Sequence, residues 1–198
     1  MNKNIPGYLA NQKLAIVVID MQNDFLLDGA PVQCPGGLET IPYIDKLLNL
    51  ARNKNIPIIY TQEVHRSEKV DFGLELQGDE PEHCLEGSEG IKIIDPLNMK
   101  QGDLLIIKRR YSAFFATDLD LLLKGLGVQL LILTGVATDV CVRATAQDAQ
   151  QLNYRVVVPK ECVAGTNNDR HLAALENIRY LFGRVCDFEM IYQHIENL

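Results

Sequence analysis

The chain has 198 residues, of which 47% are hydrophobic, and it carries a formal net charge of −7 at pH 7. This length and hydrophobic content suit one domain, residues 1–198, with a substantial core. The acidic balance disfavours nucleic-acid binding, because the one basic cluster, residues 108–110, is too short, and no apolar run reaches the roughly 18 residues of a membrane-spanning helix.

The first half of the chain predicts a strand, a helix and a second strand, followed by a long irregular segment. Residues 14–19 and 57–61 are apolar runs rich in β-branched side chains, which are typical of strands buried on both faces of a sheet. Between them, residues 37–54 repeat apolar side chains at helical spacing. Residues 63–103 are long for a connection, and we expect a functional insertion there.

The second half alternates strands and helices. Strands are predicted over residues 104–108, 130–134 and 154–158, with a weaker one near residues 189–192. Helices are predicted over residues 117–125, 138–152 and 168–181, with Thr117, Asp118 and Thr138 as candidate caps. The alternation implies right-handed βαβ units and therefore an α/β fold, a three-layer α/β/α Rossmann-like domain with a mostly parallel sheet of about six strands.

Three chemically active side chains follow three of the predicted strands. Asp20 follows residues 14–19, Lys108 ends residues 104–108, and Cys141 comes shortly after residues 130–134. Because ligands bind beyond the carboxyl ends of the strands in open parallel sheets, we expect the three to meet at that edge. Taken singly, they would suit a turn cap, a solvent-directed lysine and a small buried side chain, and only their convergence favours a site.

A thiol, an ammonium and a carboxylate can together carry out nucleophilic catalysis. A free thiol has a pKa of about 8.5, and a helix N-terminus and Lys108 would both favour its thiolate. Asp20 could then accept the thiol proton and later pass it to a leaving amine. The residues therefore predict Cys141 as a nucleophile, supported by Lys108 and Asp20.

The chain also resembles the isochorismatase-like cysteine hydrolases, a superfamily that includes nicotinamidases and N-carbamoyl amide hydrolases. The resemblance rests on DMQNDF at residues 20–25, KRRYSAF at residues 108–114 and GVATDVCV at residues 135–142. It implies that Asp20, Lys108 and Cys141 are the catalytic triad and that a small amide is cleaved through a thioester. It also implies a cis peptide between Val136 and Ala137, with the N–H groups of Ala137 and Cys141 forming an oxyanion hole.

The same resemblance points to Glu63, His65 and His83 as ligands of a divalent metal. Nicotinamidases carry an Asp-x-His pair and a later histidine before a cysteine; His65 and His83 match, whereas Glu63 replaces the aspartate. Two histidines and a carboxylate suit zinc, iron or manganese with positions open for water or substrate. The alternative is that both histidines bond to the loop backbone and Glu63 pairs with Arg66, while other glutamates of this segment solvate a surface loop.

Phe25, Tyr111 and Phe115 are the expected walls of the substrate pocket, because each follows a motif residue at the active edge. Core packing is the alternative for all three and is favoured for Phe115. The chain lacks tryptophan, which nicotinamidases often use to line the pyridine pocket, and this departure argues against nicotinamide as the substrate. The remaining cysteines are expected to be structural and the remaining histidines to lie at the surface (Cys34, Cys84, Cys162 and Cys186; His171 and His194).

Together these patterns predict a cysteine-dependent hydrolase of a small-molecule amide C–N bond, either nicotinamidase-like or acting on a ureido or carbamoyl amide. The alternative is a non-enzymatic thiol sensor or small-molecule binding module on the same fold. Scattered cysteines, odd in number, and a start at residues 1–7 without the apolar core of a signal peptide indicate a reduced, cytoplasmic protein. By resemblance we expect a homodimer or homotetramer, and no cofactor other than the divalent metal.

Overall fold

The computed structural model describes residues 5–198. Residues 1–4, which belong to the expected domain 1–198 and to the start at residues 1–7, lie outside the described residues. The strands are β1 (Leu14–Ile19), β2 (Ile58–Glu63), β3 (Leu104–Lys108), β4 (Leu130–Val136), β5 (Arg155–Pro159), β6 (Val163–Ala164) and β7 (Arg184–Cys186).

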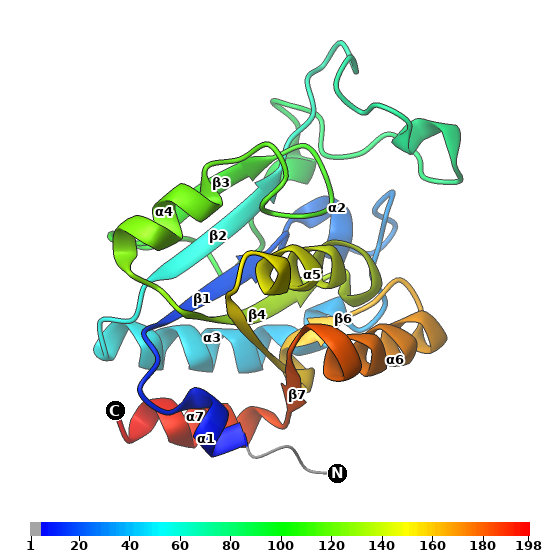
Figure 1. Ribbon diagram of the computed structural model, residues 1–198. Coiled ribbons are helices and arrows are strands. Elements are labelled where there is room, and N and C mark those ends of the chain that lie inside the picture. The colour runs from blue at the N-terminus through cyan, green and yellow to red at the C-terminus, as the bar shows by residue number, and fades with distance from the viewer. Residues whose placement is uncertain (1–4) are drawn as a thin grey trace.

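The strands form one parallel sheet at the centre of the molecule (Figure 1). Their order is β3-β2-β1-β4-β5-β7, with the short β6 paired to β4 outside this path. β1 and β4 are buried along their whole length, as their apolar sequences predict. The predicted α/β fold and mostly parallel sheet are therefore confirmed, and the sheet brings the carboxyl ends of β1, β2, β3 and β4 to one edge.

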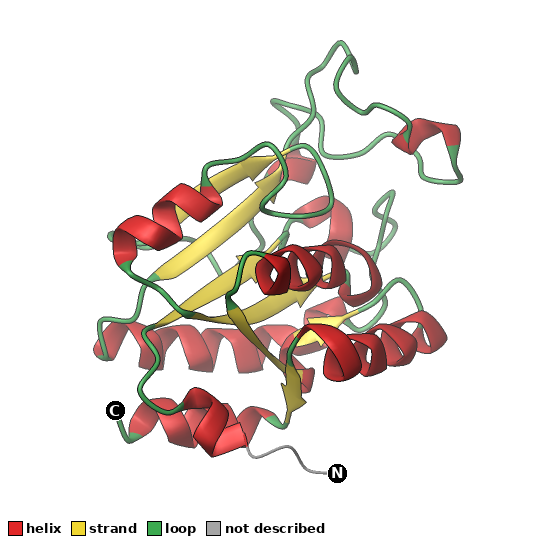
Figure 2. Cartoon of the chain, viewed as in Figure 1, coloured by secondary structure: helices red, strands yellow, loops and turns green. Residues whose placement is uncertain are grey.

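Helices cover both faces of the sheet (Figure 2). The α-helices are α1 (Ile5–Leu9), α2 (Asn23–Leu26), α3 (Gly37–Asn53), α4 (Leu119–Leu126), α5 (Arg143–Gln151), α6 (Asn168–Asn177) and α7 (Phe188–Glu196). Short 3-10 turns are η1 (Glu75–Gln77), η2 (Glu89–Ile91) and η4 (Lys160–Cys162), and π-helical turns are η3 (Thr138–Val142) and η5 (Ile178–Phe182).

Each face of the sheet has its own apolar core. One core contains Ile44 and Leu48 of α3 together with Ile191 and Ile195 of α7. The other contains side chains of α4 and α5, such as Leu123. The domain therefore has three layers, with α3 and α7 on one side and α4 and α5 on the other. Among residues 5–198, no helix has the length and apolar character that crossing a bilayer requires.

The weak strand predicted near residues 189–192 is wrong, because this segment lies within helix α7. Its buried residues Phe188, Ile191 and Ile195 are three and four apart, which is helical spacing. The last strand is instead the preceding segment, β7, which pairs with β5. A short apolar run with β-branched and aromatic residues does not by itself separate a strand from one face of a short helix.

The predicted helix 138–152 begins differently from its expected cap. Its first turn is the π-helical η3, whose N-cap is Ala137 and not Thr138. The Thr138 hydroxyl instead lies 2.9 Å from Nδ1 of His171, which is partly buried and not a surface residue as expected. The segment expected over residues 63–103 begins one residue later, since Glu63 is the last residue of β2.

Candidate active site

Asp20, Lys108 and Cys141 meet at the carboxyl edge of the sheet. Asp20 follows β1, Lys108 ends β3, and Cys141 lies in η3 directly after β4. The Lys108 Nζ lies 2.8 Å from Oδ2 of Asp20 and 3.5 Å from Sγ of Cys141. All three residues are buried. The structure therefore brings together the thiol, ammonium and carboxylate that strand-end positions predict.

The Asp20 carboxylate is held by the neighbouring strand. Asp20 has a φ of 49°, in the left-handed region that residues other than glycine adopt only in a supportive setting. Its N–H donates to Oγ1 of Thr61 (3.1 Å), and the Thr61 hydroxyl donates back to Oδ1 of Asp20 (2.6 Å). Because Thr61 lies in β2, this exchange fixes the carboxylate with its other oxygen toward Lys108.

Burial and neighbouring charges shift the pKa values of all three side chains. Burial raises the pKa of Cys141 well above its ordinary value; the charge of Lys108 opposes this, and Asp20 and Glu63 add to it. Burial also raises the pKa of Asp20, again with Lys108 opposing. Burial lowers the pKa of Lys108, but its anionic neighbours outweigh burial and hold the pKa well above the usual value. Lys108 thus favours the Cys141 thiolate, as expected, but burial acts in the opposite direction and outweighs it.

Glu63 is a fourth buried member of this group and joins it to two histidines. Its Oε2 accepts a hydrogen bond from Lys108 and lies 3.9 Å from Sγ of Cys141. Its Oε1 lies 3.0 Å from Nε2 of His83 and 3.4 Å from Nε2 of His65. Burial disfavours the carboxylate, but Lys108 and the histidines outweigh it and hold the pKa of Glu63 well below its usual value.

The backbone of Glu63 is fixed by a buried side chain, Gln22. The Gln22 amide donates to the carbonyl of Glu63 (2.9 Å) and accepts from its N–H (2.7 Å). The alternative in which Glu63 pairs with Arg66 is wrong, because Arg66 pairs with Asp71 (2.7 Å). Glu63 is thus positioned from its own strand and from the loop after β1.

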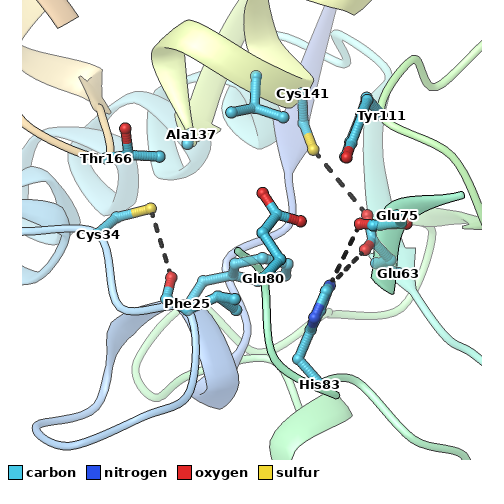
Figure 3. Close-up of a pocket in the computed structure, with 12 residues that line it drawn as sticks. Phe25, Cys34, Glu63, Glu75, Glu80, His83, Tyr111, Ala137, Cys141 and Thr166 are labelled. Carbon is cyan, nitrogen blue, oxygen red and sulfur yellow. Dashed lines mark hydrogen bonds and ion pairs between the residues drawn. The ribbon is translucent and has the colours of Figure 1, made fainter. Parts of the chain in front are cut away.

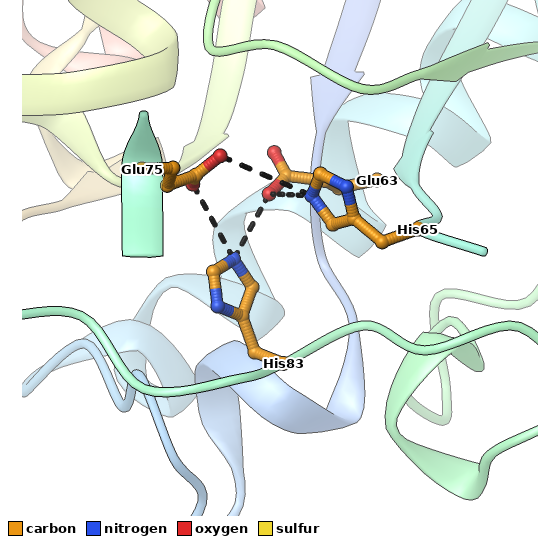
Figure 4. A group of neighbouring side chains, drawn as sticks. All are labelled: Glu63, His65, Glu75 and His83. Atoms are coloured by element: carbon orange, nitrogen blue, oxygen red, sulfur yellow. Dashed lines mark hydrogen bonds and ion pairs between the residues drawn. The ribbon is translucent and has the colours of Figure 1, made fainter. Parts of the chain in front are cut away.

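Glu63, His65, Glu75 and His83 form a cluster that can hold a metal ion (Figure 4). One ligand atom from each lies within 4.8 Å of the others. The Glu75 Oε2 is 4.0 Å from Nε2 of His65, and its Oε1 is 3.6 Å from Nε2 of His83. Sequence reasoning took Glu75 for a loop-solvating residue, and its place in the 3-10 turn η1 depends on a loop path that no local pattern predicts.

The polar atoms of this cluster fit a bound cation. The Nδ1 of His83 lies 2.8 Å from the carbonyl of Pro81, so this nitrogen carries a proton, and in the neutral ring Nε2 has a lone pair. That lone pair faces a carboxylate oxygen of Glu63, and two acceptors at this distance require a proton or a cation between them. Burial opposes protonation of His83, but Glu63 outweighs it and raises the pKa to about 9. Oε1 of Glu75 is buried without a hydrogen-bond donor.

A cavity opens onto the Cys141 thiol (Figure 3). Phe25 and Tyr111 line it, as the expected pocket walls. Phe115 does not; its side chain is 60% exposed and lines a separate surface depression with Asp71, so it is neither a wall of this cavity nor a core residue. The cavity is also lined by residues that the sequence did not single out for it (Val32, Cys34, Glu75, Glu80, Val140 and Thr166).

The loop between β4 and η3 forms another wall of the cavity. The peptide bond between Val136 and Ala137 is cis, and Ala137 lines the cavity beside Cys141. The five cysteines are buried and unpaired. Cys34, expected to be purely structural, faces the cavity, and burial raises the pKa of its thiol to about 12.

Comparison with known proteins gives consistent matches over most of the chain. Residues 14–190 match the isochorismatase domain. A protein of Arabidopsis thaliana named "Probable inactive nicotinamidase" is 33% identical over 171 residues, which cover 83% of this chain and 87% of that protein. The maleamate amidohydrolase of Pseudomonas putida is 30% identical over 189 residues, which cover 94% of this chain and 89% of that protein.

A solved structure adds a metal-bound comparison. The pyrazinamidase of Pyrococcus horikoshii in complex with zinc has a TM-score of 0.81 against this chain at 29% identity. The match covers 88% of this chain and 99% of that one.

Proposed function

Because the chain belongs to the isochorismatase family, whose relatives include amidohydrolases, we propose that it hydrolyses the C–N bond of a small amide through a thioester on Cys141. The observation that carries the proposal is the position of Lys108, within hydrogen-bond distance of both Asp20 and Cys141, the latter of which lines a cavity. A relative named as inactive means that this arrangement must be tested for turnover.

In the first half of the proposed reaction, Sγ of Cys141 attacks the amide carbonyl while its proton passes to Asp20. The raised pKa of Asp20 lets the carboxyl group hold that proton, and Lys108 remains an ammonium that balances the negative charge. The N–H groups of Ala137 and Cys141 are proposed to stabilise the oxyanion. Asp20 then gives the proton to the leaving nitrogen, which departs as ammonia or an amine.

In the second half, water hydrolyses the thioester. Asp20, again ionised, accepts a proton from the attacking water and returns it to the Cys141 sulfur as the acid product leaves. Each half of the reaction thus uses the same carboxylate once as a base and once as an acid. Thr61 keeps this carboxylate in place throughout.

Glu63, His65, Glu75 and His83 are proposed to hold one divalent metal ion, with zinc, iron and manganese as the candidates. When bound, the ion would supply a Lewis acid that orients the polar end of the substrate or a water molecule. The two oxygens of Glu63 would divide their roles, since Oε1 faces the histidines and Oε2 accepts from Lys108. The name of the Pyrococcus pyrazinamidase structure, which includes zinc, supports this assignment.

The finer features of the proposal rest on the resemblance and on the pocket. The substrate is a nicotinamidase-type amide or a ureido or carbamoyl amide, and Phe25 and Tyr111 contact it. A homodimer or homotetramer in the cytoplasm is the proposed state of the protein. No nucleic acid and no membrane is a proposed partner.

The test is ammonia release from nicotinamide, pyrazinamide, maleamate and several ureido and carbamoyl amides. Wild type is compared with Cys141→Ala, each with and without added zinc, iron or manganese. We expect at least one amide to be hydrolysed by wild type only. Equal turnover by Cys141→Ala would refute the thioester, and metal dependence of the wild-type rate would support the proposed ligands.

A thiol sensor is the competing function, and the surroundings of Cys141 argue against it. Sensor thiols are accessible and have a lowered pKa. Cys141 is 4% exposed and its pKa is raised. A buried thiol next to a carboxylate that can take its proton suits a nucleophile that ionises only during reaction.

A further inference from the structure

The cavity in front of Cys141 has an unbalanced negative lining. Three glutamates line it, Glu63, Glu75 and Glu80, and its lining contains neither lysine nor arginine. Lys108 contacts two lining residues, Cys141 and Glu63, but its ammonium is already bound by Asp20 and Glu63. The basic side chain of the lining, His83, is likewise paired with Glu63 (3.0 Å). A substrate entering the cavity therefore meets carboxylates before it meets any free positive charge.

Glu80 is the glutamate that most directly faces a substrate. Its carboxylate points into the middle of the cavity, between Cys141 and His83 (Figure 3). Its side chain contacts that of Glu75, whose pKa is raised to about 7 by burial, by Glu63 and by Glu80. Within residues 5–198 no lysine or arginine pairs with Glu80, so its charge is not balanced by a cation. Glu82, two residues after Glu80, pairs with Lys69 at the surface (2.6 Å). The same loop therefore gives Glu82 a cationic partner but leaves Glu80 without one among the described residues.

A bound metal ion would not reverse this charge. Its two positive charges would be matched by the carboxylates of Glu63 and Glu75, and Glu80 would stay unbalanced. Arg170 contacts a lining residue, since its Nη1 lies 3.4 Å from Oγ1 of Thr166. That hydroxyl donates to the carboxylate of Asp139 (2.6 Å), so an acidic group lies beside this cation as well.

We propose that this cavity accepts a neutral or positively charged amide whose N–H groups face Glu80, and that it excludes amides bearing a carboxylate, such as maleamate. The inference rests on the proposed function for the scissile bond, and it adds the charge of the group remote from that bond. Hydrogen-bond donors of a ureido or amino group would pair with Glu80, whereas a carboxylate there would be repelled across a partly dehydrated space.

The charge of the cavity can be measured without any turnover. Iodoacetate and iodoacetamide differ by one negative charge, and their rates of reaction at Cys141 are followed by peptide mass spectrometry and normalised to 2-mercaptoethanol. We expect the iodoacetate rate to be depressed about tenfold relative to iodoacetamide, and Glu80→Gln to restore about half of that factor on a logarithmic scale. Glu82→Gln is the matched control and should leave the ratio unchanged.

Turnover gives the second measurement. Succinamate, butanamide and 3-aminopropanamide are similar in length and carry a negative, a neutral and a positive remote group. We expect kcat/KM to rise in that order, and Glu80→Gln to reduce the spread, with Glu82→Gln again as the control. The difference should shrink in high salt, which screens charges in a cavity open to solvent.

The outcomes separate the two proposals. If no amide is hydrolysed but the alkylation ratio behaves as expected, the proposed function fails and the charge selectivity stands. If iodoacetate reacts without depression or Glu80→Gln leaves the ratio unchanged, the inference is wrong whatever the amide assay gives. A preference for succinamate that Arg170→Gln abolishes would show that the cavity recognises carboxylates through its rim.

Discussion

One ammonium group, that of Lys108, holds two carboxylates and a thiol in a buried space. Asp20 lies at 2.8 Å, Cys141 at 3.5 Å, and Glu63 is in direct contact. Breaking a buried charge pair by removing one partner costs roughly 3–5 kcal/mol, because the other charge is left unpaired. Isosteric changes at the carboxylates are therefore better probes than removal of the lysine.

Asp20→Asn should separate turnover from thiol reactivity. The variant keeps an oxygen for the Thr61 hydroxyl, and asparagine tolerates a positive φ. Without a proton acceptor, kcat should fall by about 10²–10⁴-fold. Removing the negative charge beside Cys141 lowers the pKa of the thiol, because Asp20 raises it in the wild type.

More thiolate is then present at a given pH, so alkylation of Cys141 by iodoacetamide should shift to lower pH in Asp20→Asn. Measuring both kcat and the pH profile of alkylation checks the prediction, with Asp28→Asn as a surface control. Parallel loss of turnover and of alkylation would mean that the variant had lost the site's structure.

The meeting of Asp20, Lys108 and Cys141 could be predicted at the residue level because all three are fixed by strand ends. Asp20, Lys108 and Cys141 each follow or end an apolar run, so their meeting depends only on the order of a parallel sheet. Glu75 and Glu80 could not be predicted, since they come from an irregular segment whose path is set by tertiary contacts. Acidic residues in such a segment look the same whether they face solvent or a cavity.

At the scale of elements, β4 pairs closely with β1 up to the residue just before the cis peptide. Gly135 pairs with Ile19 and has a φ of 100°. A Cβ at Gly135 would lie 2.0 Å from the backbone oxygen of Ile19. No side chain fits there without moving the strand that carries Asp20.

Gly135→Ala should therefore destabilise the protein by more than about 3 kcal/mol, through the clash and the disfavoured φ. Gly125→Ala, in the exposed part of helix α4 with no atom within 4 Å of the new Cβ, should instead stabilise by roughly 0.5–1 kcal/mol. Urea unfolding of both variants and the wild type measures the free energies. Similar stabilities for the two variants would contradict the close approach of β4 and β1.

Elements with a strong periodic signal were predictable, and the short C-terminal ones were not. Helix α3 and strands β1 and β4 follow their apolar patterns closely. Strand β7 has three residues, and helix α7 exposes much of its surface between Phe188 and Ile195. For such short segments, the identity of the packing partner decides the conformation, and local sequence does not contain it.

At the scale of the whole molecule, alternation of strands and helices predicts the layers, whereas the segment between β2 and β3 gives the site its individual chemistry. This segment extends beyond the sheet in Figure 1, yet it returns Glu75 and His83 to the residues at the end of β2. A metal ion held by the cluster would tie this segment to the sheet. Its binding would then contribute to the stability of the whole domain.

Removal of divalent metal by a chelator should lower the melting temperature. A ligand at about 100 times its dissociation constant stabilises by about 2.7 kcal/mol, which for a chain of this size corresponds to about 5–10 °C. Glu75→Gln should weaken the effect, because it removes one carboxylate of the cluster, and Glu82→Gln at the surface should not. Metal analysis should find about one ion per chain in the wild type.

The same ion should protect the connecting segment from proteolysis, because ligands from η1 and from the stretch before Cys84 would be held against β2. Limited digestion with and without chelator should then show faster cleavage within residues 66–82 in the chelated protein, restored by adding zinc. If incubation with zinc, iron and manganese leaves the protein metal-free, with unchanged melting and digestion, the cluster is a network of histidine–carboxylate hydrogen bonds. In that case His83, whose pKa is raised to about 9, is protonated and its Nε2 donates a hydrogen bond to Glu63.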